Sequence, residues 1–167
     1  MQKTEWFNRK FPAMEDNGLL PQITERLSGT PARLEEMIAL IPSGKLTIKP
    51  AGKWSIKEEL GHLSDLEPLW LGRVDDLIAH RPELSAADLT NQKTHQAGHN
   101  STEVHVLLQR FRELRMDLVK KLRDLDESQL LYSSLHSRLK TPMRAIDLAY
   151  FVAEHDDHHL ACIRTLM

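Results

Sequence analysis

The chain has very little cysteine and no long apolar run. Cys162 is the single cysteine among 167 residues, so no disulfide can form within the chain, which is typical of a reducing compartment. Residues 1–18 lack the apolar run of a signal peptide, and no stretch approaches 18 apolar residues. We therefore expect a cytoplasmic protein without a membrane-spanning segment.

An excess of either charge is also missing. The chain carries 22 lysines and arginines against 24 aspartates and glutamates, which gives a formal net charge of -2. Such a balance does not predict the basic surface that binds nucleic acid or an anionic membrane. With 28% charged and 41% hydrophobic residues, the composition is that of an ordinary globular protein. The length favours one domain over residues 1–167.

Internal repeats and convincing strand signals are absent as well, whereas helical periodicity is clear. Apolar residues recur at spacings of three, four or seven in four segments, at about 19–41, 55–80, 100–125 and 141–167. Polar connections separate them at 42–54, 81–99 and 126–140. The only candidate strand is Leu46–Ile48. Four amphipathic helices of this length predict an all-α fold, a four-helix bundle.

Helix starts are indicated by residues that satisfy free backbone donors. Ser55 and Glu58 have the spacing of a capping box, and Asn100 and Glu103 repeat it before the third helix. Thr141-Pro142 has a capping residue followed by the residue best suited to the first helical position. These signals predict the starts of the second, third and fourth helices.

Two prolines lie inside the helical patterns. Pro31 follows Gly29-Thr30, so Thr30 either caps a second helix or marks a kink in a continuous one. Pro68 is expected to kink the second helix or to end its first half.

The nine histidines are unusual, and three of them lie in the stretch HDDHH at 155–159. On a helix, His155 and His159 project side by side and can bind one metal ion, although hydrogen bonds would also satisfy them once buried. A catalytic site of the zinc type needs a third protein ligand. His62, which lies among the apolar residues of the second helix, is the best candidate.

The remaining histidines have weaker signals. His95 and His99 share the same spacing, but Gly98 and polar neighbours favour a solvated loop or a weak helix. His158 should point away from the pair, exposed or hydrogen-bonded. His136 precedes the fourth helix and could overhang a pocket at the helix ends.

Other residues near these histidines have two readings each. Asp156 and Asp157 either orient an imidazole from behind the ligands or are solvated. Cys162 is a small core residue rather than a fourth ligand or a nucleophile. Trp54 and Trp70 are expected to pack in the core, and Trp70 could line a pocket two turns from His62. No catalytic residue is assigned.

Two segments also carry a family resemblance. KWSIKEELGHLSDLE followed by LW, and DLAYFVAEHDDHHLACI about ninety residues later, resemble the DinB/YfiT-like superfamily of metal-dependent proteins. ITERLSGTPARLEEMI and ADLTNQKTHQAGHN extend the likeness over nearly the whole chain. The resemblance implies a four-helix bundle with one long crossover connection and a three-histidine metal site in a cleft between helices. The matching positions are His62, His155 and His159.

The resemblance further implies a divalent metal ion, zinc or nickel, and a homodimer. One of His95 and His99 would face the cleft, without being a ligand. A divalent ion on three neutral imidazoles can lower the pKa of a bound water to about 7, and the resulting hydroxide favours hydrolysis. The same ion can instead bind a thiol as its thiolate, which favours thiol transfer. The implied function is that of a hydrolase or thiol S-transferase acting on a small molecule, with a low-molecular-weight thiol as one partner. The alternative is a non-catalytic stress-response or ligand-binding module whose metal is structural or absent.

Overall fold

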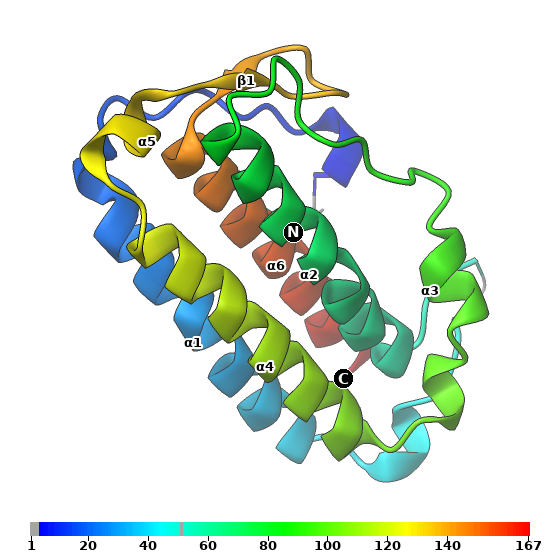
Figure 1. Ribbon diagram of the computed structural model, residues 1–167. Helices are drawn as coiled ribbons and strands as arrows, with labels where there is room; N and C mark the ends of the chain where they lie inside the picture. The colour runs from blue at the N-terminus through cyan, green and yellow to red at the C-terminus, as the bar shows by residue number, and fades with distance from the viewer. Residues whose placement is uncertain (1–3, 51) are drawn as a thin grey trace.

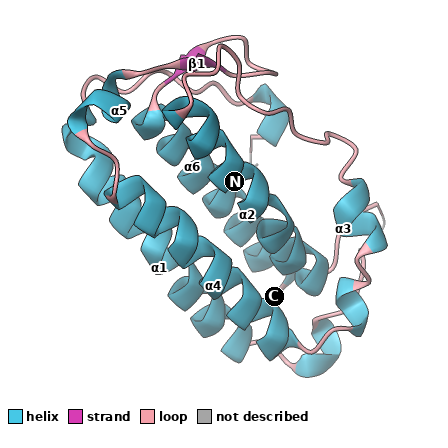
Figure 2. Cartoon of the chain, in the orientation of Figure 1, coloured by secondary structure: helices cyan, strands magenta, loops and turns pink. Residues whose placement is uncertain are grey.

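Four long helices dominate the computed structural model, which describes residues 4–50 and 52–167 (Figure 1). They are α1 (Leu20–Ala39), α2 (Ile56–Ile78), α4 (Val104–Arg123) and α6 (Ala145–Leu166). The connections contain the short helices α3 (Gln92–Gln96) and α5 (Glu127–Leu131) and the 3-10 turns η1 (Trp6–Asn8), η2 (Asn17–Leu19), η3 (Ser43–Lys45) and η4 (His99–Ser101). Strands β1 (Ser134–Leu135) and β2 (Pro142–Met143) pair antiparallel near one end of the bundle (Figure 2).

Each long helix packs its apolar stripe against two neighbours. Helices α1 and α2 both contact α4 and α6. In one half of the core, the first halves of α1 and α6 pack with the second halves of α2 and α4, and in the other half this relation is reversed. Helices α1 and α6 therefore run in one direction and α2 and α4 in the other. The predicted all-α four-helix bundle is confirmed.

A long crossover connection joins α2 to α4. Because these two helices run parallel, residues 79–103 must return the chain along the length of the bundle (Figure 1). On the way, α3 and η4 pack against α2. The crossover thus brings polar residues of a loop segment onto the face of α2 that carries His62.

Neither internal proline breaks its helix, which corrects the expected interruptions. Helix α1 is continuous through Pro31, and α2 is continuous through Pro68. Proline lacks the N–H that would bond to the carbonyl four residues earlier. For Pro31 this carbonyl belongs to Leu27, and Arg115 Nη1 lies 3.5 Å from its oxygen. Core packing of both halves of each helix overrides the local preference.

Of the three predicted helix starts, the one at Ser55 is confirmed as a complete capping box. The start at Asn100 is wrong, because α4 begins at Val104 and Asn100 instead accepts a hydrogen bond from Ser55 Oγ at 2.6 Å. Asn100 is therefore engaged by another helix and does not cap its own.

The start at Thr141-Pro142 is also wrong, because Pro142 belongs to β2 and α6 begins at Ala145. The Asp147 carboxylate accepts the Arg144 N–H at 2.9 Å and so satisfies the actual helix start. Leu46–Ile48 is not a strand; Leu46 is buried just after the 3-10 turn η3.

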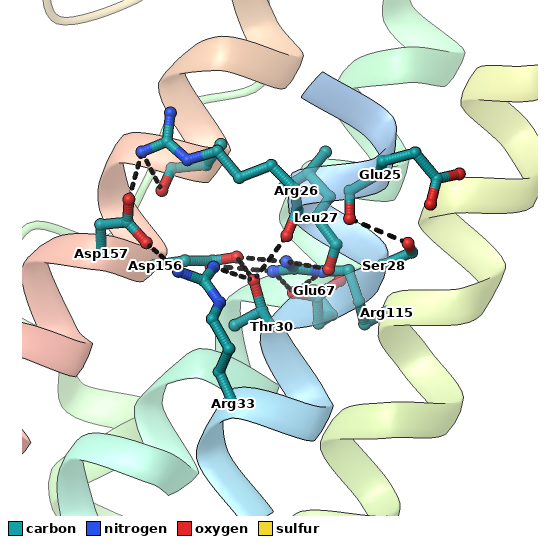
Figure 3. A network of polar contacts seen from close by, with 11 residues as sticks. Glu25, Arg26, Leu27, Ser28, Thr30, Arg33, Glu67, Arg115, Asp156 and Asp157 are labelled. Atoms are coloured by element: carbon teal, nitrogen blue, oxygen red, sulfur yellow. Dashed lines mark hydrogen bonds and ion pairs between the residues drawn. The ribbon is translucent and has the colours of Figure 1, made fainter. Parts of the chain in front are cut away.

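A buried polar layer divides the apolar core into two clusters. Each long helix contributes one residue to it: Thr30 on α1, Glu67 on α2, Arg115 on α4 and Asp156 on α6, all at most 2% exposed. Figure 3 shows the Arg115 guanidinium reaching both carboxylates. The layer fixes the four helices relative to one another in the middle of the bundle. Within the described residues, no helix is both long and apolar enough to cross a membrane.

Candidate metal centre

Three histidine rings from two helices converge in the middle of the bundle. The ring centroid of His62 on α2 lies 5.4 Å from that of His155 and 4.8 Å from that of His159, both on α6. The i,i+4 spacing places the two α6 rings 4.4 Å apart. One nitrogen from each residue lies within 4.8 Å of the other two, and all three side chains are buried.

Glu59 determines which nitrogen of His159 is available. The Nδ1 atom of His159 lies 2.6 Å from Glu59 Oε2, so a neutral ring donates its Nδ1–H to this carboxylate. The Nε2 atom then carries a lone pair, and it points toward His155 Nε2 at 3.1 Å. Two nitrogens on one tetrahedral zinc ion, each about 2.0–2.1 Å from it, lie about 3.3 Å apart. The observed separation fits such a pair of ligands.

A chain of hydrogen bonds orients His62 in the same way. His62 Nδ1 lies 3.0 Å from Thr94 Oγ1, and this hydroxyl donates its proton to Asp65 Oδ2 at 3.0 Å. With its proton engaged, the hydroxyl oxygen can only accept, so His62 carries its proton on Nδ1 and a lone pair on Nε2. His99 Nε2 also lies 2.8 Å from Asp65 Oδ2 and completes the chain.

Asp65 is ionised in this arrangement. Burial alone would raise the pKa of its carboxyl, but the hydrogen bonds from His99 and Thr94 and the charge of Lys93 hold the pKa below its ordinary value. An ionised Asp65 accepts from both donors at once. This is the pattern in which a carboxylate behind the ligands fixes the tautomer of a metal-binding histidine.

His62 and His155 are neutral at physiological pH. Burial, and next the charge of His159, lower the pKa of His62 to about 2, and burial with the same neighbour places the pKa of His155 well below its ordinary value. Neutral imidazole is the form that binds metal. His155 Nδ1 has no hydrogen-bond partner among the described residues, so His155 is the ligand candidate with the least support behind it.

The triad opens into a cavity of about 420 Å³. Aromatic rings form much of its wall: Trp54 lies 4.6 Å from His62, and Trp70 lies 5.5 Å from His155, centroid to centroid. Trp70 is among the residues that line this pocket, and it is only 3% exposed. This site is a largely apolar pocket with a few convergent polar groups, which is the usual form of a small-molecule site.

Comparison with known families decides the affiliation. A sequence model of the DinB superfamily matches residues 26–163. The chain belongs to the DinB superfamily. This confirms the resemblance carried by the two histidine-bearing segments, while no curated protein matches the chain in sequence.

Two solved structures share the DinB fold of this chain. One is YfiT from Bacillus subtilis, described as "a probable metal-dependent hydrolase with an unusual four-helix bundle topology"; the TM-score is 0.80 at 19% identity, over 95% of this chain and 91% of that one. The other is the mycothiol-dependent maleylpyruvate isomerase, with a TM-score of 0.67 at 10% identity, over 84% of this chain and 59% of that one. At such identities the likeness shows the fold alone.

The other histidines of the DinB chain have separate places. His99 is buried on Asp65, whereas His95 is exposed on α3 and contacts the Trp54 ring at 5.9 Å. His136 lines the pocket from the loop after β1. His158 lines it too and contacts Trp6, so it does not point away from the site as expected.

The two aspartates of HDDHH face other helices rather than the imidazoles. The buried Asp156 fits neither expected reading, whereas Asp157 is partly solvated, with 37% of its side chain exposed. Asp156 accepts hydrogen bonds from Arg115 and Thr30, and Asp157 pairs with two arginines of α1 (Figure 3). Residues one and two positions after His155 lie on other faces of the helix, toward α1 and α4. These aspartates anchor α6 in the bundle and make no hydrogen bond to a histidine.

Cys162 is half-buried and lines the pocket, so the expectation of a core residue is wrong. One turn beyond His159, the helix faces the cavity rather than a neighbouring helix. Ligand atoms of Cys162, Glu59 and His159 also lie within 4.8 Å of one another. The sequence correctly predicted that Cys162 lies on the fourth long helix, but it did not predict that the thiol lines the cavity.

Sequence reasoning missed the residues that hold the ligands in place. Glu59 precedes His62 by three positions on one helix, a spacing that could have indicated a shared face. Thr94 has no comparable signal, because it reaches His62 only through the path of the crossover connection. Arg73 and Arg138, which line the pocket, were also missed.

Proposed function

We propose that this DinB chain binds one divalent metal ion, zinc or nickel, through His62, His155 and His159. On this site it acts as an enzyme on a small molecule, transferring a low-molecular-weight thiol to an electrophile or hydrolysing a bond. A homodimeric assembly is part of the same proposal.

One observation carries the proposal. Glu59 and Thr94 set the tautomers of two buried histidines so that the Nε2 atom of each carries a lone pair, and a third histidine lies beside them. Imidazole nitrogens that converge in this way are the usual ligands of a divalent ion. The ring separations, and the neutral state of His62 and His155, suit a divalent ion with three protein ligands and at least one open position.

When bound, such an ion supplies a Lewis acid that lowers the pKa of a water or thiol group. The chain's own residues do the rest. Trp54 and Trp70 shield the ligands from bulk water, and Glu59 and Thr94 hold the imidazoles in one orientation. Thiol transfer receives support from the thiol-dependent isomerase that shares this fold, and hydrolysis from the description of YfiT.

Elemental analysis of untagged protein tests the site. We expect close to one zinc or nickel ion per chain, and His62→Ala, His155→Ala and His159→Ala should each lower the occupancy strongly. His105→Ala is the matched control, because His105 is exposed on α4 away from the triad. Full occupancy in all three ligand variants would reject the proposed site.

The same preparations separate enzyme from binding module. Metal-loaded and metal-stripped protein are incubated with a panel of electrophiles, with and without a low-molecular-weight thiol. Turnover that needs both metal and thiol indicates thiol transfer, and turnover that needs metal alone indicates hydrolysis. Full metal occupancy without turnover would favour a structural metal.

A further inference from the structure

A second polar cluster lines the cavity that contains the three histidines. It consists of Arg73 on α2 and of His136 and Arg138 from the connection between β1 and β2. Arg73 Nη1 lies 3.2 Å from His136 Nε2, and its Nε donates to the carbonyl of Ser85 at 2.9 Å. None of these residues belongs to the candidate metal centre.

Three donors in this cluster lack an acceptor. His136 Nδ1 accepts the backbone N–H groups of Arg138 and Leu139, each at 3.2 Å, so the neutral ring carries its proton on Nε2. This Nε2–H then faces an N–H group of Arg73, and two donors meet without an acceptor between them. The Nη2 atom of Arg138 is buried and has no hydrogen-bond partner among the described residues.

The cluster also lacks a counter-charge. Arg73 is only 1% exposed, yet neither Arg73 nor Arg138 forms an ion pair with any described residue. Asp76, an acidic neighbour of Arg73, is engaged by the Ser85 N–H and by Arg81. Burial lowers the pKa of Arg73 to about 10; Asp76 opposes this effect and Arg138 adds to it. Buried charges are normally paired, so the buried guanidinium of Arg73, together with the buried Nη2 atom of the half-buried Arg138, indicates a place for an anion.

The carboxylates of the cavity wall do not fill this role. Glu59 is bound to His159, and Asp88 accepts the backbone N–H groups of Thr90 and Gln92. Glu5 is exposed on the N-terminal segment and makes no ion pair with a described residue. Among the described residues, no carboxylate of the cavity wall is bound to these donors, so the cluster can take an anion from outside the chain.

Aromatic rings connect the cluster with the metal centre. The Trp70 ring contacts both His155, at 5.5 Å between centroids, and the Arg73 guanidinium, at 5.2 Å. Phe151 similarly contacts His136 at 5.1 Å and Trp70 at 5.9 Å. One small molecule lying along these rings can reach both polar groups within the same cavity.

We propose that Arg73, His136 and Arg138 form an anion subsite that binds a carboxylate of the substrate and directs the rest of the molecule toward the histidine triad. The planar fork of a guanidinium matches a carboxylate in two parallel hydrogen bonds. The subsite itself stands on the geometry above. That its ligand is the substrate of a metal-dependent reaction depends on the proposed function.

Binding of succinate to metal-stripped protein tests the subsite without any metal or turnover. The chelator is dialysed away, and calorimetry is done in a Tris chloride buffer of low ionic strength. We expect saturable succinate binding to the wild type, weakened about tenfold or more by Arg138→Gln, because a charge-assisted pair is lost. Arg138→Lys should retain part of the affinity, and succinamide, which is uncharged, should not bind.

Lys140→Gln is the matched control, since Lys140 is exposed on the same connection and pairs with Glu83. Its affinity for succinate should stay within about twofold of the wild type. Equal losses in Lys140→Gln and Arg138→Gln, or no succinate binding at all, would overturn the subsite. Tighter binding of inorganic phosphate than of succinate would overturn the carboxylate assignment. Succinate binding without metal-dependent turnover would leave the subsite standing and reject the proposed function.

Discussion

At the scale of single residues, the candidate site depends on where protons sit on neutral histidines. The proton of the Thr94 hydroxyl is used by Asp65, so its oxygen accepts from His62. A ring nitrogen that donates in this way raises the basicity of the opposite nitrogen and fixes the orientation of the ring. The lone pair of His62 is therefore fixed on Nε2 before any ion binds.

We predict that Thr94→Val, which keeps the shape of the side chain and removes the hydroxyl, weakens zinc binding by about 10- to 100-fold. The affinity is measured by competition with a chromophoric chelator. Thr90→Val is the control, because the Thr90 hydroxyl donates to the exposed Asp88 of the same connection and bonds to no other described residue. Equal zinc affinity in wild type and Thr94→Val would show that His62 needs no support from the crossover.

At the scale of elements, the crossover connection docks on α2 through one close contact. Gly61 is the position at which this happens: a Cβ atom there would overlap the His99 ring, which is held by Asp65 at 2.8 Å. Gly72, in the same helix, has open space around its missing Cβ. Substituting alanine at Gly72 therefore measures the gain in helix propensity alone, whereas the same substitution at Gly61 also includes the cost of displacing the crossover connection.

We therefore predict opposite effects of the same substitution. Gly61→Ala should lower the free energy of unfolding by about 1–3 kcal/mol, because the fixed His99 ring must move. Gly72→Ala should raise it by up to about 1 kcal/mol, since alanine favours the helix. Urea denaturation of the two variants measures both values. A similar shift in the same direction for both would mean that the His99 contact does not constrain the crossover.

Elements with a strong apolar period were predictable from sequence, but two of the three predicted helix starts were wrong. The stripes of all four long helices and the capping box at Ser55 were read correctly. Pro31 and Pro68 indicated breaks because a local rule takes no account of the packing on both sides of each proline. Pro142 indicated a helix start, but in the structure it belongs to strand β2, which pairs with β1.

The candidate site was also predictable only where its residues lie on the long helices. His62, His155 and His159 are found by helical spacing and family resemblance, since two of them share one helix face. Thr94 and Arg138 were not found, because they meet the pocket only through the tertiary paths of the connections. A loop residue that supports a ligand from another element leaves no periodic signal in the sequence.

At the scale of the whole molecule, one arginine ties the four helices together across the core. Arg115 is fully buried and binds Glu67 at 2.5 Å and Asp156 at 2.9 Å, while Asp156 also accepts from Thr30. Arg112, one turn earlier on the same helix, instead pairs with Glu35 at the surface. The same substitution at these two arginines therefore compares a buried ionic network with an exposed ion pair.

We predict that Arg115→Met lowers the free energy of unfolding of metal-free protein by about 3–5 kcal/mol, because two carboxylates stay buried without a cation. Arg112→Met should change it by at most about 1 kcal/mol, as both partners are largely solvated. Urea denaturation in a chelating buffer excludes any contribution from lost metal. Similar small losses in both variants would show that the polar layer does not hold the helices together.

The loss in Arg115→Met should also depend on pH. Burial already raises the pKa of Glu67 above its ordinary 4.5, against the opposing charge of Arg115, so removing the arginine must raise it further. A carboxyl with a raised folded-state pKa adds no penalty below its unfolded value, and its penalty grows as pH rises through the folded value. The difference in unfolding free energy between wild type and Arg115→Met should therefore be larger at pH 7 than at pH 5. A difference that grows on acidification would mean that the charge of Glu67 is not what the arginine compensates.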